Sequence, residues 1–161
     1  RVIRMVEDGD TNRSKYHLCM MLSWVFALAN SLRQNRPGHS LEFAWRQTYP
    51  NLGDIHPTLR KLQELTDKTS KGGNLEMRVL KLAGAVATIG ANLEYLRGTH
   101  EERHLAALVK SLVVTSEAIC DVATFLGFDL QSEFAETFKH GCFTCREVPC
   151  VKCGFNPSQV M

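Results

Sequence analysis

The fold is decided by residues 75–98, LEMRVLKLAGAVATIGANLEYLRG, which carry the most regular apolar pattern in the chain. The large apolar residues of this stretch recur at alternating steps of four and three: Leu75, Val79, Leu82, Val86, Ile89, Leu93 and Leu96. This spacing predicts one long α-helix with a continuous apolar stripe. The residues on its opposite side are small: Gly84, Ala87, Thr88 and Ala91. Small side chains there would let another helix or a ligand come close.

The segments on either side of this helix are also typical of helices. A second long helix is expected from about Glu101 to Gly127, with an apolar stripe of its own: Leu105, Leu108, Leu112, Ile119, Ala123 and Leu126. An apolar helix is expected over 14–33, and shorter ones after Ser40, after Pro57 and over 131–139. No stretch alternates as a strand would. The sequence therefore predicts an all-α fold, an antiparallel helical bundle built from residues 14–33 and 75–126.

Composition and charge narrow the class of protein. The chain has 161 residues, 44% of them apolar and 22% charged, which suffices for a buried core. A net charge of +2 gives no electrostatic case for binding nucleic acid. The longest apolar run, residues 18–32, is shorter than the roughly 20 residues needed to span a bilayer. We predict no membrane association and, from the cysteine usage, a reducing, cytoplasmic setting.

The strongest motif is CFTCREVPCVKC, residues 142–153, in which two Cys-x2-Cys pairs follow each other closely. Four thiolates at this spacing can converge on one tetrahedral ion. We predict a closed structural zinc site with these ligands: Cys142, Cys145, Cys150 and Cys153. The alternative is that these cysteines bind no metal or form disulfides. Cys19 and Cys120 lie in apolar helical segments and are expected to be core residues.

A pair of carboxylates lies four residues apart in the second long helix, at Glu117 and Asp121. They are expected to project from one face of the helix, roughly opposite its apolar stripe. They could bind Mg²⁺ if carboxylates from a second helix faced them. The alternative is a solvated helix face, which is the more frequent situation for such charges.

The two ends of the chain resemble each other weakly. Residues 41–51, LEFAWRQTYPN, parallel residues 132–142, SEFAETFKHGC, and each stretch follows an apolar helix. Both resemble the MazG-like, all-α nucleotide pyrophosphohydrolases. Residues 56–73 look like the first helix and turn of that family, and residues 77–98 look like its second helix. The helix with Glu117 and Asp121, a short acidic helix and the cysteine-rich tail then follow in the family's order.

The resemblance implies three parts. Residues 1–51 would be a partial MazG-like helical repeat, 52–139 a MazG-like helical domain, and 140–161 the four-cysteine zinc knuckle and tail. The family is implied to hydrolyse nucleoside triphosphates to monophosphates and pyrophosphate. It would do so with Mg²⁺ held by carboxylates on two facing helices. The first repeat is expected to pack on the second as subunits of the family pack in a dimer.

The acidic positions that such chemistry requires are largely replaced. Positions expected to be acidic carry other residues: Gly84, Ala85, Thr88 and Ala118, and in the first repeat Tyr16, His17 and Met20. Glu117 and Asp121 would then be at most the remnant of a Mg²⁺ site. We predict a MazG-like protein with degraded metal ligands that acts as a nucleotide-binding module or as a structural or interaction module. Self-association or a larger assembly is the expected partnership. The alternative is an active pyrophosphohydrolase that completes its site with another subunit or with a further segment.

Overall fold

The computed structural model describes residues 10–35, 41–50, 58–69, 73–99 and 101–139. Every regular element within these ranges is a helix, as predicted, and none of them contains a strand. The helices are α2 (Thr11–Asn35), α3 (Leu41–Thr48), α4 (Leu59–Thr69), α5 (Leu75–Thr99), α6 (Glu102–Phe125) and α7 (Leu130–Thr137). The all-α class is therefore confirmed, and the expected helix boundaries hold to within a few residues.

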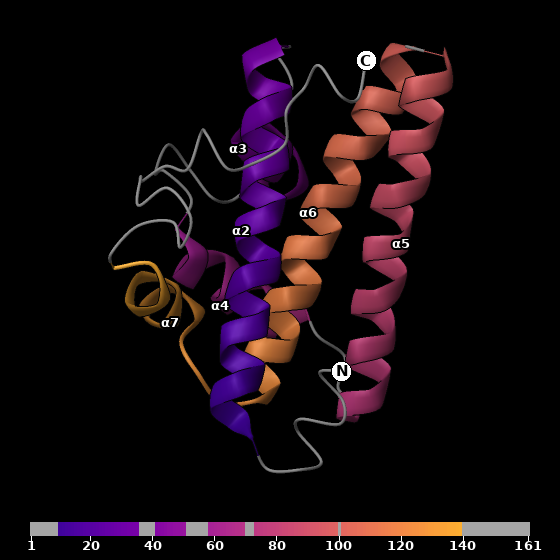
Figure 1. The fold of residues 1–161 in the computed structure, drawn as a ribbon. Coiled ribbons are helices and arrows are strands. Elements are labelled where there is room, and N and C mark those ends of the chain that lie inside the picture. The colour runs from indigo at the N-terminus through magenta and orange to yellow at the C-terminus, as the bar shows by residue number, and fades with distance from the viewer. Residues whose placement is uncertain (1–9, 36–40, 51–57, 70–72, 100, 140–161) are drawn as a thin grey trace.

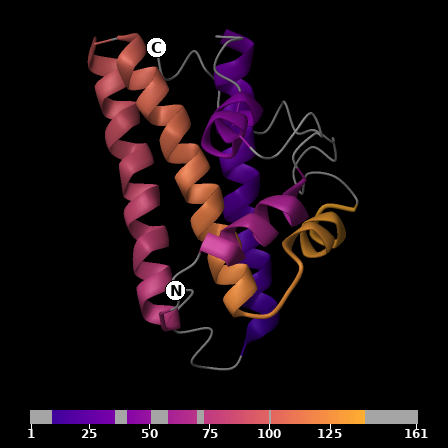
Figure 2. The same ribbon diagram turned by 180° about the vertical axis from the view of Figure 1, so that it is seen from behind.

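The three long helices lie side by side, with α6 between α2 and α5 (Figures 1 and 2). The chain runs in opposite directions in α6 and in its two long neighbours, as expected of an antiparallel bundle. The short helices α3, α4 and α7 pack around α2 and α6. Helix α5 instead packs mainly on α6 and forms the outer edge of the molecule.

Helix α6 is the centre of the core because apolar side chains cover most of its circumference. Its fully or almost fully buried residues include Leu105, Leu108, Leu112, Ile119, Cys120, Val122 and Ala123. The predicted stripe of this helix is thus confirmed, although the buried surface is much wider than a stripe. Cys19 of α2 is fully buried as well, so both isolated cysteines are core residues as expected.

The predicted stripe of α5 is correct along most of its length and wrong at one residue. Leu82 is buried and Leu75, Val79 and Ile89 are partly buried against the core, but Val86 is 41% exposed. Ala85 is buried in its place. A repeat of strict four-and-three steps drifts around a straight helix, which has 3.6 residues per turn, so the contact line on α6 passes through the neighbouring position.

A glycine ends α6 and a capped turn begins α7. Gly127 has a φ of +74°, a left-handed conformation that side chains disfavour, and its position confirms the predicted end of the helix. The backbone N–H of Ser132 then donates a 2.7 Å hydrogen bond to the side chain of Asp129, the N-cap of α7.

Helices α3 and α7, to which the two similar stretches contribute, contact the same aromatic ring on α2. Phe26 makes edge-to-face contacts with Trp45 of α3 and with Phe134 of α7. The buried core includes residues from α2 and α3 as well as from α4 to α7. Residues on both sides of the expected boundary at 51/52 therefore share one core. The three-part division by family resemblance stays a prediction.

Candidate functional site

The predicted zinc ligands Cys142, Cys145, Cys150 and Cys153 lie outside the described residues. The zinc site therefore stays a prediction from the sequence.

Asp121 is bound by an arginine of the neighbouring helix. The Nη1 group of Arg78, in the first turn of α5, donates a hydrogen bond to the Asp121 carboxylate, and the two side chains form a salt bridge. Each of these side chains is only 11% exposed. The Arg78 guanidinium also lies 5.1 Å from the ring centroid of Phe125, one turn beyond Asp121. The charge of Asp121 is thus neutralised from within the bundle.

Glu117, one turn earlier on α6, is bound by a residue from a different part of the chain. The Tyr49 hydroxyl, just beyond α3, donates a 2.8 Å hydrogen bond to Oε1 of Glu117. Burial raises the pKa of Glu117, and the hydrogen bond from Tyr49 partly offsets this rise. Burial and the nearby carboxylate also raise the pKa of Tyr49 well above its usual range. Tyr49 therefore remains a hydrogen-bond donor throughout the physiological pH range.

The alternative of a solvated helix face does not hold for this pair. Asp121 as a whole residue is 8% exposed and Glu117 is half-buried, and each side chain is bound by another part of the chain, Asp121 by Arg78 and Glu117 by Tyr49. Sequence reasoning missed both partners. Arg78 carried a signal, since it is a charged residue on the apolar side of its helix, next to Val79. Tyr49 carried none, because it lies far from Glu117 in the sequence.

The surroundings of Asp121 do not fit a cluster of Mg²⁺ ligands. No group of three or more His, Cys, Asp or Glu side chains that could hold a metal occurs among the described residues. The position of a cation beside Asp121 is filled by the Arg78 guanidinium. Of the α5 positions expected to be acidic, Ala85 is buried, whereas Gly84 and Thr88 lie on the exposed outer side of the helix. Carboxylates at those two positions would not face α6.

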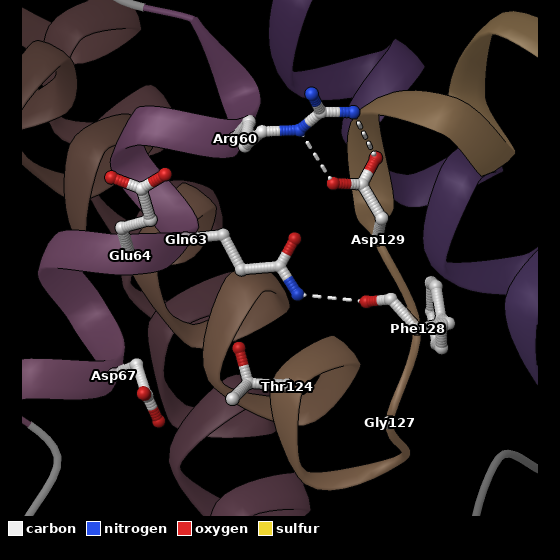
Figure 3. A pocket seen from close by; sticks show the side chains of 8 residues that line it. All are labelled: Arg60, Gln63, Glu64, Asp67, Thr124, Gly127, Phe128 and Asp129. Carbon is white, nitrogen blue, oxygen red and sulfur yellow. Dashed lines mark hydrogen bonds and ion pairs between the residues drawn. The ribbon is translucent and has the colours of Figure 1, made fainter.

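A separate pocket of about 330 Å³ lies between α4 and the α6–α7 connection. Figure 3 shows its lining residues: Arg60, Gln63, Glu64, Asp67, Thr124, Gly127, Phe128 and Asp129. Nε of Arg60 donates a 2.8 Å hydrogen bond to Asp129. The Gln63 amide donates to the carbonyl of Phe128 at 2.8 Å and accepts from the backbone N–H of Leu130 at 2.9 Å. These bonds tie α4 to the start of α7.

Most polar side chains that line this pocket already have hydrogen-bond or ion-pair partners within the protein. The carboxylate of Glu64 forms a 3.2 Å salt bridge with Lys61 on the same helix. Oγ1 of Thr124 is a buried lining atom that has no hydrogen-bond partner in the described part of the chain. A single hydroxyl in a pocket open to solvent does not fix the orientation of a ligand. We interpret this pocket as a structural junction.

No family model, curated protein or solved structure matches the chain. The likeness to MazG-like enzymes rests on the sequence features given above.

Proposed function

We propose that this chain is a MazG-like helical module that has lost the Mg²⁺-dependent hydrolysis of nucleoside triphosphates and serves binding or assembly. The observation that carries this proposal is the buried salt bridge between Arg78 and Asp121. Hydrolysis of this kind needs several carboxylates that hold divalent ions against the phosphates. Here a guanidinium, which is charged at every physiological pH, neutralises Asp121, and Tyr49 binds Glu117.

We further propose a structural role for zinc at the C-terminus. Cys142, Cys145, Cys150 and Cys153 would hold one ion in a closed tetrahedron, without an open position for catalysis. Such a knuckle would fasten the tail that follows α7. It would stabilise the tail of a protein whose proposed role is to bind another molecule rather than to catalyse a reaction.

The proposal is tested by measuring pyrophosphate release. The full chain is incubated with each common nucleoside triphosphate and with Mg²⁺ or Mn²⁺. We expect no release above the protein-free blank, and no change in Asp121→Asn, which keeps an acceptor for Arg78. Glu136→Gln serves as the matched control because Glu136 is an exposed carboxylate on α7, with 68% of its side chain accessible. Circular dichroism verifies that both variants are folded.

The alternative, an active pyrophosphohydrolase with a site completed by another subunit, gives a different pattern. Release would then be detectable, abolished by Asp121→Asn and retained by Glu136→Gln. That pattern would refute the proposal. The proposed module could bind nucleotides or could serve assembly alone. Titration with a non-hydrolysable nucleoside triphosphate distinguishes these two roles, because only a nucleotide-binding module would show saturable binding.

A further inference from the structure

We draw no further inference here: the strongest candidate, the exposed apolar outer side of helix α5 around Met77, Leu80 and Tyr95, carries none because nothing in the described part of the structure shows what covers it.

Discussion

At the scale of single residues, the neighbours of Asp121 decide whether its carboxylate is free to bind a metal ion. The pair Glu117 and Asp121 is visible in the sequence, and its spacing correctly places both residues on one side of a helix. Whether that side meets water, a metal ion or another side chain is not a local property. The structure supplies Arg78 from α5 and Tyr49 from beyond α3.

Loss of Arg78 should destabilise the fold strongly. Arg78→Met leaves Asp121 buried without its counter-charge, which costs about 3 kcal/mol of unfolding free energy. Replacing both partners, in Arg78→Met with Asp121→Leu, should recover most of this loss. Urea unfolding followed by circular dichroism measures both. Arg97→Met is the control, because Arg97 and its partner Glu94 are 52% and 75% exposed and their salt bridge contributes at most about 0.5 kcal/mol. Equal losses at the two sites would contradict the argument.

At the scale of helices, the pattern of apolar residues predicts each element but not its neighbours. The start of α7 shows this. A short helix is evident near Gln131, and Asp129 is a suitable N-cap by residue type. The sequence does not show that Arg60 and Gln63 of α4 bind the same turn from a distant part of the chain.

The junction between α4 and α7 should respond to acid. Hydrogen bonds from Arg60 and Ser132 lower the pKa of Asp129 from its ordinary 3.8 to about 2. Because the folded pKa lies below the unfolded one, this junction contributes stability above about pH 4, and the contribution is lost as the pH falls toward 2. An NMR titration of the Asp129 carboxyl should give a midpoint near 2. Arg60→Met should move that midpoint upward, whereas Arg97→Met, which alters a distant exposed salt bridge, should not. An unchanged midpoint in Arg60→Met would show that Arg60 is not the cause.

At the scale of the whole molecule, a single core contains residues from both sides of the boundary that the sequence predicts at 51/52. Helices α2 and α3 pack into the same core as α4 to α7, with α6 at its centre. Helix α5 is attached to this core by one side only. The zinc site predicted at the C-terminal cysteines is the remaining part of the molecule. Whether it exists can be decided by measuring the metal content of the protein.

Removal of zinc should affect the tail before it affects the helices. Elemental analysis of the chain should find about one zinc ion per molecule, and Cys145→Ser should lower this content. Cys19→Ala, which changes a buried cysteine of α2, should leave it unchanged. A chelator should increase proteolysis within residues 140–155 while the helical circular dichroism signal stays constant. A tail whose proteolysis does not change on chelation would contradict the zinc prediction.

The sequence by itself determined the all-α class, the positions of the helices, the end of α6 at Gly127 and most of the buried side of α5. These follow from the period of apolar residues and from glycine's backbone freedom, both of which act between residues close in the chain. Only the tertiary structure decided that Arg78 meets Asp121, that Tyr49 meets Glu117, that Ala85 replaces Val86 in the core, and that the outer side of α5 is left exposed. Those outcomes depend on which helix packs against which, and packing is set by the summed contacts of segments far apart in the sequence.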